Sequence, residues 1–209
     1  MIDSQCKICR RAGEKLFLKG EKCFSPKCLM VRKPYPPGQK RKRRFSSLSD
    51  YGKELKEKQR LKNWYNLQEK QLRKYVKEAL QKRGKVEDTS SLLIRKLESR
   101  LDNVVLKLGF AKSKAQARQM IGHRFFLVNG KKINIPSYQV KKGDKISIAP
   151  LKIKKNIFQN INITLKKHQV PSWIEINREK LEGRIVSYPS VEEAALPIEI
   201  PLIFEFYSK

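Results

Sequence analysis

The stretch from Arg100 to Ile148 limits the possible folds most strongly, because two helical patterns are followed there by hairpin signals. Apolar residues recur at the i, i+3, i+4 and i+7 spacing of one helix face, at Leu101, Val104, Val105 and Leu108. Gly109 follows, and glycine is favoured just after a helix because it adopts positive φ at little cost. The sequence therefore predicts a short helix that ends at Gly109.

A second helix is predicted over about residues 114 to 121. Ser113 is a favoured N-cap residue, and Gln116 three positions later completes a capping-box pattern. The expected apolar face is Ala117, Met120 and Ile121. Lys114 and Arg118 are four residues apart and therefore neighbours on the other face. Free N–H groups at a helix start beside two cations suit a phosphate backbone.

Strand signals come next. Phe126–Val128 is an apolar run, Asn129-Gly130 is a preferred two-residue hairpin turn, and Lys131–Ile135 is the expected return strand. A third strand is expected over Lys145–Ala149, after Gly143-Asp144. This unit is predicted to be a helix pair on a small antiparallel sheet. It contains no acid–base pair or nucleophile constellation, so we interpret its surface as a binding surface and predict no enzyme activity.

The charge of the chain indicates the partner. Lys and Arg number 48 against 20 Asp and Glu, a formal net charge of +28, and such an excess repels itself unless a polyanion neutralises it. Nucleic acid is therefore the expected partner. No apolar run approaches the roughly 18 residues of a spanning helix, and the N-terminus shows neither a secretory nor a transit pattern. We expect no membrane association, and a protein that is cytosolic or made inside an organelle.

All four cysteines fall near the N-terminus, in the pairs Cys6/Cys9 and Cys23/Cys28. Two close thiol pairs joined by a short loop are the pattern of a tetrahedral zinc site. An iron–sulfur cluster, two disulfides and four free buried thiols are the alternatives, and a cytosolic setting disfavours disulfides. Cations flank the thiols and are expected to hold them as thiolates, namely Lys7, Arg10, Arg11, Lys22 and Lys27.

Residues 34 to 44 combine a proline-rich turn with a run of cations. Pro34, Pro36 and Pro37 exclude a helix. The run that follows contains Lys40, Arg41, Lys42, Arg43 and Arg44. Charge runs of this kind are usually solvated arms, and an arm that is mobile when free can become ordered on phosphates when RNA is bound.

Residues 49 to 82 are predicted to be helical, with Ser49 as a cap and a break at Asn66. Apolar stripes there, including Leu61 and Leu72, are interpreted as core. A polar linker and a further helix over Leu92–Ser99 lead into the central unit. Near the end of the chain, Ile174 and Ile176 alternate with polar residues and indicate a short strand. The acidic stretch 189–201 is expected to face protein or solvent.

Several motifs of this chain resemble the signature of the bacterial-type S-four family of small ribosomal subunit proteins. In the central unit they are residues 102–105, 109–111, 113–119, 128–130 and 134–138. Residues 19–28 resemble the cysteine-containing version of that family's N-terminus. Residues 51–52, 55–61 and 69–73 resemble its helical domain, and 170–174, 181–184 and 204–209 its C-terminal third. The central module also occurs in unrelated enzymes, so the flanking segments decide in favour of the ribosomal family.

The resemblance implies a structural constituent of the small ribosomal subunit. Such a protein would bind the five-prime domain of the small-subunit rRNA directly, clamp a junction of helices and nucleate assembly. It would neighbour two other small-subunit proteins, the third and the fifth, at the messenger RNA entry channel and contribute to translational accuracy. Its location would be the ribosome of a bacterial cytoplasm or of a bacterial-type organelle.

The resemblance also implies an organisation and a set of sites. The fold class is α+β, divided into a zinc segment with a basic arm (1–45), a helical domain (46–95), an S-four-type module (96–150) and a C-terminal extension that returns to the helical domain (151–209). One structural zinc ion would be held by Cys6, Cys9, Cys23 and Cys28. The expected phosphate contacts are Lys40 to Arg44, Lys58, Arg60, Arg73, Lys112, Lys114 and Arg118, while Ser113 and Gln116 shape the helix start.

The chain departs from the family pattern in two places. The loop after Gly38-Gln39 is shorter by about two residues than the family's usual form. His123-Arg124-Phe125 stands where the family usually has His-Gly-His. Either Arg124 carries the strain of a left-handed helix exit, or Gly122 absorbs it. His123 is either an RNA contact or a helix cap, and Phe125 is expected to join the core.

Two other functions were weighed. Arg100-Leu101-Asp102 also resembles the surroundings of the catalytic aspartate of pseudouridine synthases. Asp102 here opens a helix of the module itself, so an interaction with the helix N–H groups is the better interpretation. A regulator that represses its own messenger or modulates transcription would use the same binding surface, and the sequence does not separate that role from the ribosomal one.

Overall fold

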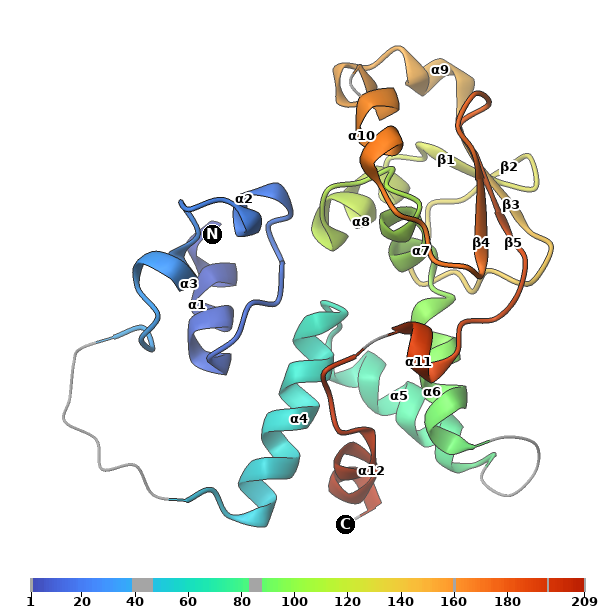
Figure 1. Ribbon diagram of the computed structural model, residues 1–209. Helices are drawn as coiled ribbons and strands as arrows, with labels where there is room; N and C mark the ends of the chain where they lie inside the picture. Colours follow the sequence, from blue (N-terminus) through green and yellow to red (C-terminus); the bar gives the residue numbers. More distant parts are fainter. Residues whose placement is uncertain (1, 39–46, 83–87, 160, 195, 209) are drawn as a thin grey trace. The chain divides into compact units, whose positions relative to one another are not determined.

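The structure is a computed structural model that describes residues 2–38, 47–82, 88–159, 161–194 and 196–208 (Figure 1). The chain divides into two compact units. The first comprises residues 1–90 together with 197–209, and the second comprises residues 91–196. Within the described ranges, no helix is long and apolar enough to cross a membrane.

The first unit begins with three helices, α1 (Ile2–Ala12), α2 (Glu21–Phe24) and α3 (Leu29–Arg32), and α1 packs against α3. The sequence predicted no helix in this segment, so α1 was not expected. Cys6 and Cys9 lie on α1 three residues apart, and this spacing places them on one face of the helix. The helix therefore aims both thiols in one direction.

Two longer helices follow, α4 (Asp50–Trp64) and α5 (Glu69–Leu80). The Ser49 hydroxyl accepts a hydrogen bond from the Gly52 N–H at 3.2 Å, as expected of an N-cap. Asn66 has a φ of 52° between the two helices, which confirms the predicted break. Leu61 on α4 and Leu72 on α5 are both 0% exposed and form part of the core of this unit.

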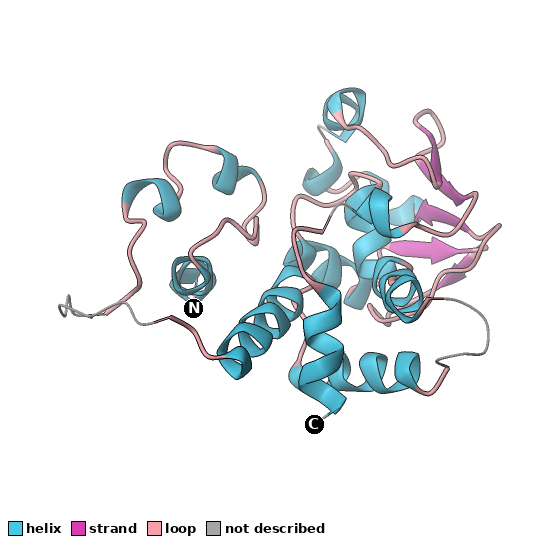
Figure 2. Cartoon of the chain, turned by 60° about the horizontal axis from the view of Figure 1, so that its bottom comes forward, coloured by secondary structure: helices cyan, strands magenta, loops and turns pink. Residues whose placement is uncertain are grey.

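The chain returns to this unit at its C-terminal end. The last helix, α12 (Ile200–Ser208), packs against α4 and α5 (Figures 1 and 2). Its buried face is formed by Ile200 and Ile203. The residues from 197 onward thus belong to the first unit.

The second unit contains the predicted helix pair and a larger sheet than predicted. Its first helices are α6 (Thr89–Glu98), α7 (Leu101–Lys107) and α8 (Lys114–Gly122). The strands are β1 (Phe126–Val128), β2 (Lys131–Lys132), β3 (Lys145–Ile148), β4 (Ile174–Asn177) and β5 (Glu182–Ile185). They form one antiparallel sheet in the order β2-β1-β3-β5-β4. An α+β fold class is therefore confirmed.

Short helices complete this unit, namely α9 (Pro150–Ile153), η1 (Asn156–Phe158), α10 (Ile161–Lys167) and α11 (Val191–Ala194). Residues 151–196 belong to the second unit, whereas the sequence grouped them with the C-terminal return. The reason is the pairing of β5 with β3, which joins this stretch to the sheet of the central module. The division into four segments is therefore replaced by two compact units.

The return strand of the hairpin is shorter than predicted. It ends at Lys132 and does not continue to Ile135. The chain turns away from the sheet there because two of the carbonyls that follow accept hydrogen bonds from the start of α7. The Leu101 N–H donates to the Tyr138 carbonyl at 2.9 Å, and the Asp102 N–H donates to the Pro136 carbonyl at 3.1 Å. These contacts satisfy N–H groups that a helix start otherwise leaves without partners.

The helices and the sheet share one hydrophobic core. It includes residues of α7, α8 and all the central strands, with Leu108, Phe126 and Ile146 at 0% exposure. Gly109 has a φ of 80°, which confirms it as the residue after the first helix of the pair. A Cβ at Gly183 on β5 would lie 2.3 Å from Leu108 Cδ2, so the strand approaches α7 closely because it carries no side chain there.

Candidate nucleic-acid interface

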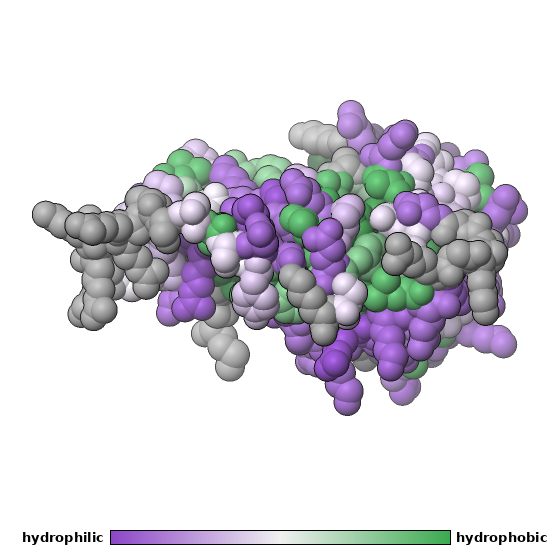
Figure 3. Space-filling model, turned by 90° about the horizontal axis from the view of Figure 1, so that it is seen from below, coloured by the Kyte–Doolittle hydropathy of each residue, from purple (hydrophilic) through white to green (hydrophobic). Residues whose placement is uncertain are grey.

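Hydrophilic side chains cover most of the face seen in Figure 3, with smaller hydrophobic areas between them. In the second unit, several of the predicted contact residues gather at the start of α8. The Ser113 hydroxyl accepts from the Gln116 N–H at 3.2 Å, which confirms the predicted cap. The Gln116 side chain accepts from the Lys112 N–H at 2.8 Å, one residue earlier than a capping box places this bond. Lys112 itself is exposed.

Arg118, on the same helix, is held by a buried carboxylate. Its Nε donates to Asp102 Oδ2 at 2.7 Å, and 24% of its side chain is exposed. Arg100, which is buried, donates to both oxygens of Asp102 at 3.1 Å and 2.9 Å. Asp102 therefore binds two guanidinium groups.

This arrangement corrects the interpretation of Asp102. Its carboxylate was expected to receive the N–H groups at the start of its own helix. Carbonyls of Pro136 and Tyr138 already accept from that helix start, so the carboxylate can bind Arg100 and Arg118. Both Asp102 and Arg100 are at most 2% exposed, which leaves no room for a substrate beside this aspartate.

Lys114 lies close to this network and is half-buried. Burial lowers the pKa of its ammonium to about 7, although the Glu98 and Asp102 carboxylates act in the opposite direction. Glu98 is itself buried and accepts from the Asn103 amide at 2.5 Å. A phosphate at this place would favour the charged form of Lys114.

The exit of α8 resolves the alternatives left open for residues 122 to 125. Arg124 has a φ of 57° and carries the left-handed conformation itself. Phe125 is 5% exposed and belongs to the core, as predicted. His123 occupies the C-cap position of α8, where its N–H donates to the Gln119 carbonyl at 3.0 Å. It is also exposed, with its ring 6.4 Å from that of Phe125, and its contact with RNA stays a prediction.

In the first unit, Lys58 is not a surface cation. It is 6% exposed, and its ammonium pairs with Glu69 at 2.8 Å. It also lies 4.3 Å from the ring centroid of Phe206 on α12. The assignment of Lys58 to the open face is therefore wrong: the returning helix covers it and its charge is neutralised inside the protein.

Arg60 and Arg73 have different environments in the same unit. Arg60 is ion-paired with Glu14 and Glu57, and these carboxylates raise its pKa although burial acts to lower it. Its guanidinium joins α4 to the loop after α1. Arg73 is exposed on α5, where a cation can meet phosphate. The predicted contacts Lys40, Arg41, Lys42, Arg43 and Arg44 lie outside the described residues.

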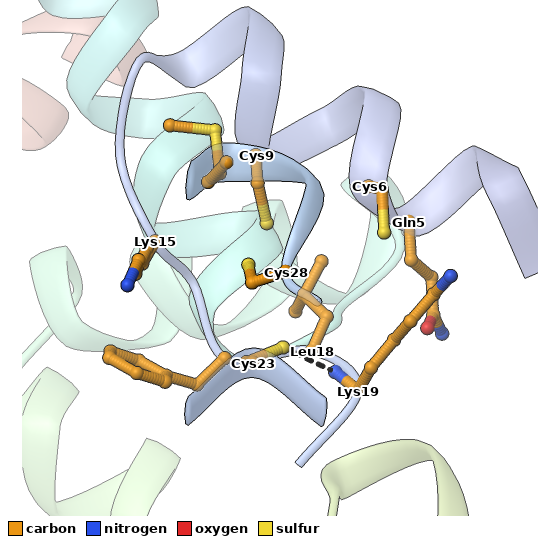
Figure 4. A pocket seen from close by; sticks show the side chains of 10 residues that line it. Gln5, Cys6, Cys9, Lys15, Leu18, Lys19, Cys23 and Cys28 are labelled. Atoms are coloured by element: carbon orange, nitrogen blue, oxygen red, sulfur yellow. Dashed lines mark hydrogen bonds between the residues drawn. The ribbon is translucent and has the colours of Figure 1, made fainter. Parts of the chain in front are cut away.

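The four cysteines are brought together. Cys6 and Cys9 from α1, Cys23 from α2 and Cys28 at the start of α3 line one cavity of about 10 Å³, room for one small ion (Figure 4). All four are free thiols. The Lys19 N–H donates to Cys23 Sγ at 3.4 Å, the kind of backbone bond that supports a thiolate ligand.

The cavity does not by itself constitute a formed metal site. Among the residues that the structure describes, no group of three or more His, Cys, Asp or Glu side chains stands in metal-holding geometry. Burial raises the pKa of the Cys9 thiol, a hydrogen bond from the Leu16 backbone lowers it, and the other three thiols raise it further. The expected stabilisation of thiolates by flanking cations is therefore not seen at Cys9. The donor set, four thiols around a small cavity, nevertheless fits one thiophilic ion.

Other exposed cations of the second unit were missed by sequence reasoning. They are Lys131, Lys132, Lys141, Lys142 and Lys145, on β2, β3 and the turn before β3. The only sequence signal was their position next to hairpin turns. A further cation–aromatic pair, Arg95 with Tyr188, joins residues 93 positions apart (188 − 95), and no local pattern indicates it.

The fold and this surface define a class of RNA-binding module, and comparison with known proteins agrees. Residues 1–98 match the family model of the ribosomal protein S4/S9 N-terminal domain, and residues 99–146 match that of the S4 domain. The chain is 43% identical over 208 residues to the small ribosomal subunit protein uS4 of Thermus thermophilus, covering 100% of this chain and 98% of that protein. The protein of the same name from Natranaerobius thermophilus is 44% identical over 204 residues, covering 98% and 96%.

A third relative, uS4 of Thermotoga petrophila, is 44% identical over 205 residues, covering 98% of this chain and 96% of its own length. This chain belongs to the uS4 family of small ribosomal subunit proteins. The family consists of ribosomal structural proteins and not of enzymes, which agrees with the absence of an acid–base constellation from the sequence.

Proposed function

We propose that this protein is a structural constituent of the small ribosomal subunit and a primary binder of its rRNA. The observation that carries this conclusion is the match to uS4 proteins along the whole chain. The RNA would be the five-prime domain of the small-subunit rRNA, and binding it early would nucleate assembly. The protein would act in the cytoplasmic ribosome.

The mechanism is neutralisation of crowded phosphates by a shaped surface. Lys112 and Lys114 lie at the start of α8, where helix N–H groups add partial positive charge, and Arg118 lies one turn further along the helix. Because Arg118 is held by Asp102, it presents its guanidinium in one orientation, and a fixed cation supports recognition of one RNA shape better than a mobile one. Arg73 and the cations of residues 40–44 would extend the contact.

The neighbours would be the third and fifth proteins of the small subunit, at the entry channel of the messenger RNA. This part of the proposal rests on family resemblance. The acidic side chains Glu192 and Glu193 on α11 are exposed and suit a protein neighbour better than phosphate. Contacts of this kind would connect the protein to translational accuracy.

We also propose that the four thiols bind one structural zinc ion. Cys6, Cys9, Cys23 and Cys28 would be its ligands, because they line one small cavity and offer the thiolate set that zinc prefers. The ion would neutralise the thiolates and cross-link α1 to the two short helices that follow. Its role would be to stabilise residues 5–32 and not to take part in chemistry.

The test is a comparison of affinities. The folded five-prime domain of small-subunit rRNA and an unrelated RNA of equal length are titrated with the full chain across a salt series. A preference for the five-prime domain that persists near ~150 mM salt is expected, because nonspecific charge attraction has largely faded there. Equal affinities that collapse together would contradict the proposal and leave the regulatory role to be tested on the protein's own messenger.

A point variant locates the surface. Lys112→Ala removes an exposed cation at the start of α8 and leaves the cap itself in place, because Lys112 contributes its backbone N–H there. It should reduce the slope of log affinity against log salt by about 1, as expected for one lost phosphate contact. An unchanged slope would show that α8 does not face RNA.

A further inference from the structure

An exposed tyrosine of the second unit is held against a cation in an unusual way. Tyr188 follows β5, and 38% of its surface is exposed. The guanidinium carbon of Arg95, on α6, lies 3.4 Å from the centroid of its ring. One face of the ring is therefore covered by the guanidinium of Arg95.

The segment that carries Tyr188 is fixed on both sides. The Gly143 N–H donates to the Ile185 carbonyl at 2.8 Å, and the Ile185 N–H donates to the Asp144 carbonyl at 3.1 Å. The Val186 N–H donates to the Trp173 carbonyl at 3.0 Å. The turn before β3 thus lies beside the end of β5, three residues before the tyrosine.

The pKa of the Tyr188 phenol is shifted by the same neighbouring residues. A hydrogen bond with the Arg95 side chain lowers its pKa, and burial acts in the opposite direction. A hydrogen bond with the Lys142 backbone and the charges of Arg95 and Lys141 lower the pKa further. Lys141 and Lys142 are both exposed. The guanidinium of Arg95, the charge of Lys141 and the backbone of Lys142 therefore act on one oriented aromatic ring.

We propose that Tyr188 forms a stacking platform for one unpaired RNA base, with Lys141 and Lys142 contacting the adjacent phosphates. A splayed base has an open π face that pairs well with an aromatic ring. The bases of a regular RNA helix stack on one another, so the ligand would be a bulged or looped nucleotide. This inference rests on the proposed RNA-binding function and adds a subsite that reads single-stranded structure.

A purely structural role of the ring is the competing explanation. In that role Tyr188 would tie the end of β5 to α6 through Arg95. A tyrosine that serves the fold is usually buried, as Tyr65 is at 2% exposure. The 38% exposure of Tyr188, together with the neighbouring lysines, favours a surface that is completed by a ligand.

The experiment compares three substitutions in the full chain, titrated against the folded five-prime domain across a salt series. Tyr188→Ala should lower the affinity about 5- to 100-fold, as for other lost base–aromatic stacks. Its salt slope should equal that of the wild type, because no cation is removed. Tyr188→Phe, which keeps the ring, should bind within about twofold of the wild type, and Lys141→Ala should reduce the slope by about 1.

Tyr188→Leu separates stacking from anchoring, since leucine still covers Arg95 but offers no π face. We expect it to bind as weakly as Tyr188→Ala. Wild-type affinity of Tyr188→Leu would assign the residue to anchoring and overturn the inference, as would equal affinities of the wild type and Tyr188→Ala. If the wild type shows no preference for the five-prime domain over an unrelated RNA, the proposed function itself fails.

Discussion

A single buried carboxylate connects the core of the second unit to its binding surface. Asp102 holds Arg118 in place, so Arg118 contributes to stability as well as to the surface charge. Arg118→Met should lower the free energy of unfolding by about 1.5–3 kcal/mol, the usual worth of a hydrogen bond to a charged group. Arg100 remains as a partner, so the carboxylate is not left without one. Urea denaturation measures the change.

Arg73→Met is the matched control for this prediction. Arg73 is exposed on α5, and removing its charge should change the free energy of unfolding by no more than about 0.5 kcal/mol. Both variants should reduce the salt slope of RNA binding. Equal stabilities of the two variants would show that the Asp102–Arg118 pair adds nothing to the fold.

Lys114 makes the stability of the protein depend on pH. Burial lowers the pKa of its ammonium from 10.5 to about 7 in the folded protein, so the unfolded chain binds more protons between these values. The contribution of this lysine to the free energy of unfolding therefore rises as the pH increases from about 7 towards 10.5, and it is least favourable below pH 7. Lys114→Met removes this dependence.

The expected result is a stability difference that changes with pH. Relative to the wild type, Lys114→Met should be most stable near pH 6.5, and its advantage should shrink by pH 9.5. Denaturation at the two pH values measures this, with the exposed Lys112→Met as control, for which the difference from the wild type should stay constant. A constant difference for Lys114→Met would refute the burial effect.

The limit of sequence reasoning is visible at this scale. Ser113, Gly109 and Phe125 behave as predicted because caps, helix exits and apolar periodicity are local rules. Lys58 was misplaced because the helix that covers it lies about 140 residues further along the chain. No local pattern indicates such a contact, since the charge of a lysine looks the same whether it meets phosphate or a glutamate of its own chain.

At the scale of elements, the packing of β5 against α7 depends on a strand residue that has no side chain. Gly183 lets β5 approach α7, and a Cβ there would lie 2.3 Å from Leu108 Cδ2. Gly183→Ala should therefore lower the free energy of unfolding by about 1–3 kcal/mol through overpacking. Denaturation of the full chain measures the loss, and a stability equal to that of the wild type would mean that α7 and β5 can separate at no cost.

Gly122→Ala provides the opposite case on α8. A Cβ at this position meets no atom within 4 Å. Alanine favours the helix over glycine by about 0.5–1 kcal/mol, so this variant should be equal to or more stable than the wild type. Together, the Gly183 and Gly122 variants separate the steric cost of an added Cβ from the change in backbone conformational entropy.

The two strands β4 and β5 also mark how far the fold could be predicted. The alternation of Ile174 and Ile176 predicted β4 correctly. A glycine inside a short segment weakens the pattern of β5. Besides β4, its neighbour in the sheet is β3, nearly forty residues earlier. The helix pair and the hairpin were predictable because their contacts are local, whereas the five-stranded sheet depends on pairing over a distance.

At the scale of the whole molecule, the division into two units predicts that a disturbance in one stays local. The cysteine segment tests this, because the proposed zinc ion would stabilise residues 5–32 alone. Chelation of zinc from the wild-type protein should increase amide hydrogen exchange across α1, α2 and α3. Exchange in α7 and α8 should not change, since the core of the second unit contains no ligand of the metal.

Cys23→Ser is the variant that assigns this effect to the thiols. It removes one of four ligands, so its N-terminal segment should exchange rapidly with or without chelator, while α7 and α8 remain protected as in the wild type. Metal analysis of the purified wild type should give one zinc ion per chain. If wild-type protein contains no zinc, or if chelator raises exchange equally in Cys23→Ser, the thiols are not a zinc site. Faster exchange in α7 and α8 of either sample would contradict the independence of the two units.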